Sequence, residues 1–375
     1  MNRNLLFIAA ALLLWGFGEG MFFNFVPIYL DNQFLLGKYE IGLILGAFGF
    51  SMAITHIPAG RLADRFGRRP LLFTAWMLGL ASTLVMGNAL TLPLFLAGLF
   101  GYGLTAFVSS PLSSYVTAAR GTWPVGTALS LTTATFNMGM VLGPVTGGWI
   151  GDYFGMRTSF LVAAGVFVFS TFCVLFIQSQ PIDHHDPDDP PLGLLKNPRF
   201  VGFMGVLAFA MFAMYLAQPL TPNFLESVRG LSLSENGIIF TAGALGNALL
   251  AIVLSRANPR RGFLVAQSLV ILFAVLVWRG TDLPAFVLGY FLLGGFRASR
   301  PMAMAQAREL VHDSQMGVTY GIMETIGSVV FILTPPLAGW LFEIDPMVVY
   351  PLGIGLIAVS ILVSYLFSPR KVMNA

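Results

Sequence analysis

Four charged side chains interrupt long apolar stretches of this sequence, and their chemistry gives the first indication of function. Glu19 stands in the glycine-rich segment WGFGEGMF, Arg297 and Arg300 lie one helical turn apart, and Glu324 falls in the next apolar stretch. A charge inside an apolar run is costly, so such residues mark candidate functional sites. Glutamate can exchange a proton, and arginine can bind a carboxylate or a phosphate. We therefore expect proton transfer, ion pairing or anion binding at these positions.

The composition indicates which solvent surrounds these charges. Hydrophobic residues make up 56% of the 375 residues and charged residues 10%, against roughly 25% charged residues in a soluble domain. The chain is therefore predicted to be an integral membrane protein. The net charge of +3 does not favour nucleic acid as a partner, because the arginines lie in short gaps between apolar runs. The single cysteine, Cys173, excludes an intramolecular disulfide and a thiolate metal cluster.

Twelve apolar runs are long enough to cross a hydrocarbon core, which requires about 20 helical residues. Because the first run is longer than a secretory h-region and no small-residue cleavage site follows it, we expect it to span the membrane. The fold class predicted is an all-α integral membrane protein with twelve transmembrane helices. The runs cover residues 5–30, 39–59, 71–89, 92–115, 126–150, 158–178, 200–225, 235–255, 263–280, 284–305, 317–341 and 347–367.

A polar segment divides the twelve runs into six and six. Residues 179–199 are rich in Pro and Asp and show no apolar periodicity, so we expect a linker between an N-terminal bundle, residues 1–178, and a C-terminal bundle, residues 200–375. Fourteen of the 20 Lys and Arg residues fall in the gaps on one side of the membrane and four on the other. The positive-inside rule then predicts that both termini and the linker are cytoplasmic.

The two halves also resemble each other in sequence. At an offset of 191, the series Leu92, Pro93, Phe95, Gly98 meets Leu283, Pro284, Phe286, Gly289, and Pro144, Gly148, Trp149 meet Pro335, Gly339, Trp340. At an offset of 195, Pro27, Glu40 and Gly42 meet Pro222, Glu235 and Gly237. Six plus six helices that both start inside form a parallel repeat, related by a pseudo-two-fold axis along the membrane normal. Such a duplicated unit favours a carrier that works by alternating access over a channel or a receptor.

The charged segment GRLADRFGRRP, residues 60–70, carries a specific resemblance. It matches every defined position of the loop signature of the major facilitator superfamily, and the chain resembles that family over essentially its whole length. The resemblance implies the twelve-helix transporter fold and a cytoplasmic gate, in which Asp64 docks near Gly317 and holds the cytoplasmic side shut. The equivalent segment SRANPRRG, residues 255–262, lacks the acid, so we expect a one-sided latch. The gate residues are Gly60, Asp64, Arg65, Gly67, Arg68 and Arg69.

A second motif narrows the resemblance to one branch of the family. The segment NMGMVLGPVTGGWIG resembles the antiporter signature of proton-driven exporters, and its small residues at four-residue spacing permit close helix packing. Ordinary membrane helices are also rich in Gly and Pro, so a packing role alone is the alternative. The arginine that these exporters usually carry four residues before a G-x-G is replaced by Ala97, so proton coupling would use other residues. The motif residues are Gly139, Gly143, Pro144, Gly147 and Gly148.

The four charges at membrane depth allow two interpretations each. Glu19 is either a proton carrier, since burial favours the protonated acid, or a hydrogen-bonding group that lines a cavity. Arg297, Arg300 and Glu324 either form an ion pair that fixes helix register or gates the inner mouth, or leave a spare positive charge for an anionic substrate group. An arginine to Glu324 pair across neighbouring helices is geometrically easy.

Further polar residues complete the candidate substrate site. We expect the cavity to be lined by Asn24, Tyr102, Asn137, Gln218 and Asn247. His184 and His185 lie in the acidic linker, where a solvated loop is favoured over a metal site. No cofactor is predicted, and no nucleotide-binding or nucleophile motif indicates an enzyme.

The sequence thus predicts a secondary transporter of the plasma membrane, most consistent with proton-coupled efflux of a small organic or amphipathic solute by a monomer. The alternative is a uniporter or symporter of an organic anion that Arg297 and Arg300 recognise. A transporter-like sensor would need a signalling appendage, which the short tails do not supply.

Overall fold

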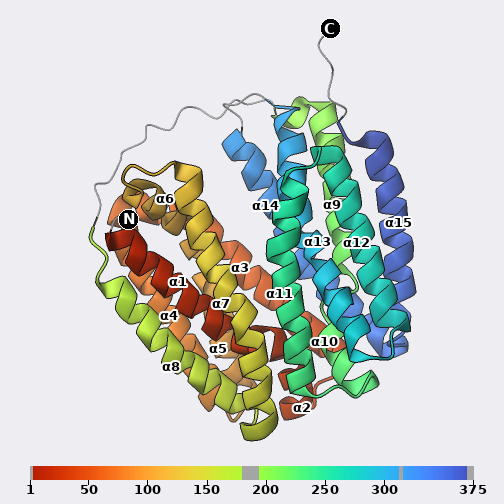
Figure 1. The fold of residues 1–375 in the computed structure, drawn as a ribbon, viewed down its shortest axis with the longest axis horizontal. Coiled ribbons are helices and arrows are strands. Elements are labelled where there is room, and N and C mark those ends of the chain that lie inside the picture. The colour runs from red at the N-terminus through yellow and green to blue at the C-terminus, as the bar shows by residue number, and fades with distance from the viewer. Residues whose placement is uncertain (1–2, 180–193, 312–315, 370–375) are drawn as a thin grey trace. The chain divides into compact units, whose positions relative to one another are not determined.

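The computed structural model describes residues 3–179, 194–311 and 316–369, without the side chains of residues 56–66, 110, 195 and 317. All regular structure in these residues is helical (Figure 1). The helices before the linker are α1 (Arg3–Phe22), α2 (Val26–Phe34), α3 (Lys38–Phe66), α4 (Arg68–Asn88), α5 (Leu92–Leu104), α6 (Ser109–Ala119), α7 (Val125–Phe154) and α8 (Met156–Leu175). Those after it are α9 (Pro198–Tyr215), α10 (Thr221–Asn223), α11 (Leu233–Ser255), α12 (Pro259–Arg279), α13 (Leu283–Arg308), α14 (Met316–Ile344) and α15 (Val349–Phe367).

Each of the twelve predicted apolar runs is occupied by helix. Within the described residues, nine helical stretches are long and apolar enough to cross a membrane, or ten if the pair Leu92–Val108 and Pro111–Ala119, bent by 40°, is one span. The two runs outside this set are α3, which ends in the charged GRLADRF segment, and α13, which carries three arginines. The prediction of an all-helical, multi-pass membrane protein is confirmed.

The first and seventh runs are broken, which the apolar pattern did not predict. A 3-10 turn at Phe23–Phe25 separates α1 from α2, and Pro27 stands in the first turn of α2. After α9, the chain turns before α10 and continues as a π-helical turn at Phe224–Val228, with Pro222 in the first turn of α10. Proline lacks the backbone N–H that an unbroken helix would need. Pro27 and Pro222 are related by the repeat offset of 195, so both halves break at equivalent places.

The predicted gap around GRLADRFGRRP is shorter in the structure. We expected it to separate runs ending at residue 59 and beginning at residue 71, but α3 continues to Phe66 and α4 begins at Arg68. Arg, Leu and Ala are good helix formers, so the charged segment extends the helix. The direction of the chain changes at Gly67, whose φ of 80° is readily adopted by glycine alone.

The chain forms two compact units. Unit 1 contains Met1–Leu36, Ala47–His185 and Leu225–Thr241, and unit 2 contains Gly37–Gly46, Asp186–Phe224 and Ala242–Ala375. Compared with a division at the linker, each unit therefore includes one short segment from the other half of the sequence. The helices α3 and α11 each run through both units.

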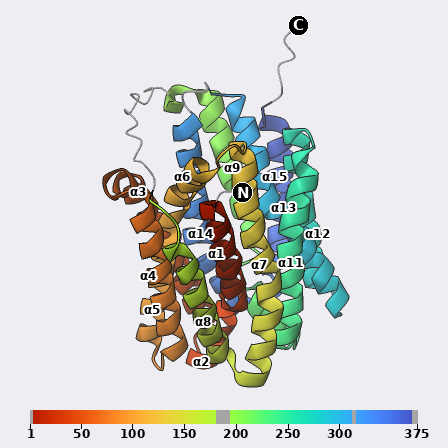
Figure 2. The same ribbon diagram turned by 60° about the vertical axis from the view of Figure 1, so that its left-hand side comes forward.

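Each unit has its own helix packing. In unit 1, α1 lies against α7 and α8, and α4 packs on α8 and α5 (Figure 2). In unit 2, α12 packs between α13 and α15, and α9 lies beside α15 and α14. Buried phenylalanines such as Phe22, Phe160 and Phe273 fill both interiors. These packed helices are the scaffold for the predicted site residues.

Candidate functional site

The carboxylate of Glu19 is held by two side chains in unit 1. Its Oε2 atom accepts a hydrogen bond of 2.8 Å from the hydroxyl of Tyr102 and one of 3.2 Å from the indole Nε1 of Trp15. Tyr102 is buried on α5, and Trp15 lies one turn before Glu19 on the same face of α1. The sequence placed Glu19 and Tyr102 in the site separately, and the structure brings them into direct contact.

Stacked aromatic rings fix this arrangement. The ring of Trp15 lies 4.3 Å from that of Phe167 at an interplanar angle of 11°, and 6.0 Å from the ring of Tyr102 at 14°. Phe22 meets Tyr102 edge-on at 5.4 Å. Trp15 and Phe167 were not among the predicted site residues. The four-residue spacing of Trp15 and Glu19 was the signal that could have identified the first, because such residues share a helix face.

The second group of predicted charges forms an ion pair in unit 2. The guanidinium of Arg300 on α13 contacts the carboxylate of Glu324 on α14, and the two side chains are 50% and 49% exposed. Arg297 lies one turn earlier on α13 and is also exposed. Next to it, Phe296 and Phe331 pack on the ring of Tyr215, at centroid distances of 5.7 and 4.6 Å from it. The predicted pairing of an arginine with Glu324 is present, and the three residues together keep one net positive charge.

The remaining polar candidates are half-buried and lie on different elements of the chain. Asn24 stands in the turn that breaks the first run, and Gln218 in the turn that breaks the seventh. The amide of Gln218 donates to the carbonyl of Met214, 2.8 Å away. Among the described residues, the side chains of Asn24, Asn137 on α7 and Asn247 on α11 donate no hydrogen bond, so they can still serve a ligand.

The predicted cytoplasmic gate is described only in part. The side chains of Asp64 and Arg65, the backbone contacts of Gly60, and the region of Gly317 lie outside the described residues, so the docking of Asp64 stays a prediction. Gly67 makes the turn between α3 and α4, and Arg69 donates a hydrogen bond of 3.2 Å to the carbonyl of Leu175 at the end of α8. Arg68 begins α4.

The antiporter-like motif is a packing surface. The glycines at four-residue spacing on α7 face the backbone of α1 so closely that a Cβ atom at any of them would collide with it. The pairs are Gly139 with Leu13, Gly143 with Phe17, and Gly147 with Met21. Gly148, next to this row, faces Leu233 of α11 instead, and α7 continues as a helix through Pro144.

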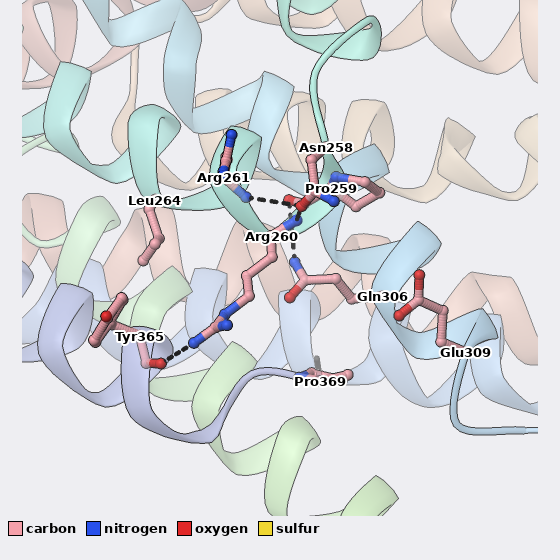
Figure 3. Close-up of a pocket in the computed structure, with 9 residues that line it drawn as sticks. All are labelled: Asn258, Pro259, Arg260, Arg261, Leu264, Gln306, Glu309, Tyr365 and Pro369. Carbon is pink, nitrogen blue, oxygen red and sulfur yellow. Dashed lines mark hydrogen bonds between the residues drawn. The ribbon is translucent and has the colours of Figure 1, made fainter. Parts of the chain in front are cut away.

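Among the described residues, two pockets lie away from the predicted site residues. One, of about 540 Å³, lies at the start of α12 in unit 2, where Arg260 covers the ring of Tyr365 at 5.2 Å and the Asn258 side chain caps the helix (Figure 3). The other, of about 330 Å³, lies in unit 1 beside Tyr29 and Arg157. The described residues hold no cluster of three or more His, Cys, Asp or Glu side chains suited to a metal ion, and His184 and His185 lie outside them.

The fold and these sites have the features of a membrane transporter, even before the sequence is compared with others. Charged and polar side chains sit within apolar spans, two of the spans are broken, and the halves are repeated, all of which are features of transporters. The nucleoside transporter NupG, in a variant form, has the same fold with a TM-score of 0.84 over 97% of this chain and 99% of that one, at 14% identity.

Sequence comparison then identifies the family. A sequence model of the Major Facilitator Superfamily matches residues 8–258 and 203–374, and the chain belongs to this family. Multidrug resistance protein 2 of Bacillus subtilis (strain 168) is 23% identical over 350 residues, covering 88% of this chain and 86% of that protein. Multidrug resistance protein 1 of the same organism is 22% identical, covering 96% and 94%.

This membership establishes the general function. The chain is a multi-pass membrane protein and a transporter of small-molecule substrates. Members of the family are transporters and not enzymes, in agreement with the prediction from the sequence.

Proposed function

We propose that this transporter exports small organic or amphipathic solutes in exchange for protons, by alternating access. It works as a monomer in the bacterial plasma membrane, with both termini in the cytoplasm. The resemblance to proteins named for multidrug resistance supports efflux as the direction. The distribution of Lys and Arg between the gaps supports the orientation.

The observation that carries the proposal is the environment of Glu19. Its carboxylate is half-buried within an apolar span, and the hydroxyl of Tyr102 and the indole of Trp15, which donate to Oε2, are neutral groups. A protonated carboxyl group still accepts hydrogen bonds at its carbonyl oxygen, so these two contacts persist when Glu19 gains a proton. These two contacts are therefore compatible with both the binding and the release of a proton at Glu19, as a coupling residue requires.

The cargo follows from the side chains around the candidate site. The polar residues Asn24 and Asn137 in unit 1 offer hydrogen-bonding groups, as does Asn247 in unit 2, whereas the broader composition is rich in Phe and Met, with 34 and 17 residues. Methionine and aromatic side chains accommodate varied apolar shapes. This combination of polar and apolar side chains suits amphipathic solutes of more than one structure.

The test is substrate-induced proton movement in liposomes that contain the purified protein and a pH-sensitive dye. Cationic drugs, sugars, lipids and organic anions are added in turn. We expect proton release on addition of a cationic or neutral drug, and its loss in Glu19→Gln, whose amide oxygen still accepts from Tyr102 and Trp15 but which cannot carry a proton.

The matched control is Glu40→Gln. Glu40 is exposed and caps the neighbouring Gly37 N–H at 2.9 Å, so removal of its charge leaves the Glu19 site intact. Full-rate transport by Glu19→Gln with unchanged pH dependence would show that Glu19 is not the proton carrier.

A second candidate function rests on the arginines of α13. Because Glu324 neutralises only one of the two, the group keeps a net positive charge that would attract a carboxylate or phosphate. Transport of an organic anion without Glu19-dependent proton movement, and loss of anion binding in Arg297→Gln, would establish this function in place of the first.

A further inference from the structure

Two carboxylates each cap the first turn of a helix that belongs to the other half of the sequence. Asp152, in the last turn of α7, accepts hydrogen bonds from the backbone N–H groups of Leu233 at 3.0 Å and Ser234 at 2.7 Å, at the start of α11. Glu343, in the last turn of α14, accepts one of 2.9 Å from the N–H of Tyr39 at the start of α3. The first contact lies within unit 1 and the second within unit 2.

The internal repeat relates these two contacts. Glu343 follows Asp152 at the offset of 191, and Ser234 follows Tyr39 at the offset of 195, the same offsets that relate the rest of the halves. The cap is thus built into the repeated unit and occurs once in each copy. It also accounts for the segment that each unit takes from the other half.

Small residues bring the helices together beside each carboxylate. A Cβ atom at any of four glycines would collide with, or press closely on, a backbone carbonyl of the opposing helix. The pairs are Gly148 with Leu233 and Gly237 with Pro144 in unit 1, and Gly339 with Lys38 and Gly42 with Pro335 in unit 2. These pairs are again related by the two offsets. The N–H groups of a first helical turn have no acceptor in their own helix, so the carboxylates satisfy donors that would otherwise need water.

We propose that Asp152 and Glu343 form a second latch, at the starts of α3 and α11, opposite to the ends where GRLADRFGRRP and SRANPRRG lie, and that both caps must release before this end of the transporter opens. The proposal rests on alternating access as the proposed function. It makes the two acids positioning residues, which set the balance between conformations and do not touch the substrate. Asp152 contributes more than Glu343, because both of its oxygens are engaged.

The test is the reaction of buried reporter cysteines in the full-length protein with a membrane-impermeant maleimide. The background is Cys173→Ser, which removes the only native cysteine. The reporters are Ile239→Cys in unit 1 and Ile41→Cys in unit 2, both at positions with 0% exposure near the capped helix starts. A third reporter, Ala119→Cys, is 1% exposed and lies at the end of unit 1 where α7 begins.

Loss of one cap destabilises the conformation in which this end is closed. The loss in free energy is about that of one helix cap, so the conformation with this end open becomes more populated. We expect Asp152→Asn to speed labelling of Ile239→Cys about fivefold and Glu343→Gln to speed labelling of Ile41→Cys about twofold. The double variant is expected to give the product, about tenfold, at both reporters. Labelling of Ala119→Cys is expected to stay unchanged, because this reporter would respond only if the variants loosened the whole fold.

Two acids at the same end provide matched controls. Glu40 caps Gly37 and Glu235 caps Ser232, each within its own segment, at 2.9 and 2.8 Å. We expect Glu40→Gln and Glu235→Gln to leave all three labelling rates unchanged. The latch is wrong if the folded double variant labels at the parental rate, or if Ala119→Cys or the control variants speed up equally. The assay contains no substrate, so a shift in labelling together with a failed proton-release assay would reject the proposed cargo and coupling but keep the latch.

Discussion

Glu19 and Glu324 are both acids within apolar spans, but the structure surrounds them differently. Glu19 accepts from the neutral groups of Tyr102 and Trp15 inside a stack of buried rings. Glu324 pairs with the cation of Arg300 on a half-exposed surface. Protonation keeps the first set of contacts but removes the attraction that holds the second.

The comparison shows that the depth of a charge does not define its role. The contacts of Glu19 with two neutral donors do not depend on its charge, whereas the contact of Glu324 with Arg300 is an ion pair. On this difference, the proposed function places proton exchange in the first half of the chain and charge balance, or anion attraction, in the second.

The strongest test of this contrast compares the two glutamine variants. We expect Glu19→Gln to lower substrate-driven proton release at least about hundredfold, in the range of lost acid–base groups, and Glu324→Gln to lower it less than about tenfold. The measurement is the initial rate of dye response in liposomes at equal protein density. Equal losses in both variants would remove the distinction between the two sites.

The ion pair is expected to show its strength in stability. Arg300→Gln leaves Glu324 without its cation, and we expect a loss of about 1 kcal/mol, well below that of a fully buried pair because both side chains are half exposed. Arg300→Gln with Glu324→Gln together should recover most of it. Thermal unfolding in detergent measures both. A double variant less stable than the single one would show that the pair is not the interaction involved.

The hydroxyl of Tyr102 can be removed without changing the ring stack. Tyr102→Phe deletes the 2.8 Å hydrogen bond, which contributes about 1 kcal/mol. We expect a change of about fivefold in the proton concentration that gives half-maximal transport, with little change in the maximal rate. A pH series of drug-driven dye response provides the measurement. An unaltered pH profile would mean that the bond does not tune Glu19.

Salt gives the smallest and most selective effect. At about 1 M NaCl the Debye length is about 3 Å, which screens exposed charges but not buried neutral contacts. We expect the stability difference between the parent and Arg300→Gln to fall below about 0.5 kcal/mol. The effect of Tyr102→Phe on the proton concentration for half-maximal transport is expected to stay the same. Equal salt dependence in the two variants would contradict the assigned environments.

The general architecture was predictable because its signals can be read directly from the sequence. The apolar runs and the arginines between them are formed by neighbouring residues, and the repeat shows as a constant offset. The pairing of Arg300 with Glu324 followed from neighbouring helices. The contact of Glu19 with Tyr102 did not, because 83 residues separate them and only the assembled helices of unit 1 bring the two side chains together.

Other features were not predicted from the sequence because the local signals for them were weak. The turns at Phe23–Phe25 and after Tyr215 lie inside predicted apolar runs, where Pro27, Pro219 and Pro222 mark them in the sequence. Asp152 and Glu343 stand at the ends of predicted spans, where acids are ordinary. Their role is visible only when the opposing helix starts are in place.

The division of α3 between the two units has one more consequence. The helix has 29 residues, with Lys38–Gly46 in unit 2 and Ala47–Phe66 in unit 1, and it spans roughly 43 Å at about 1.5 Å per residue. The Tyr39 cap lies at one end and GRLADRF at the other. Under the proposed alternating access, a rigid helix of this length couples the two ends, because a tilt at the Tyr39 cap also displaces the GRLADRF end. This coupling would oppose the opening of both ends together, and with it the formation of an open pore.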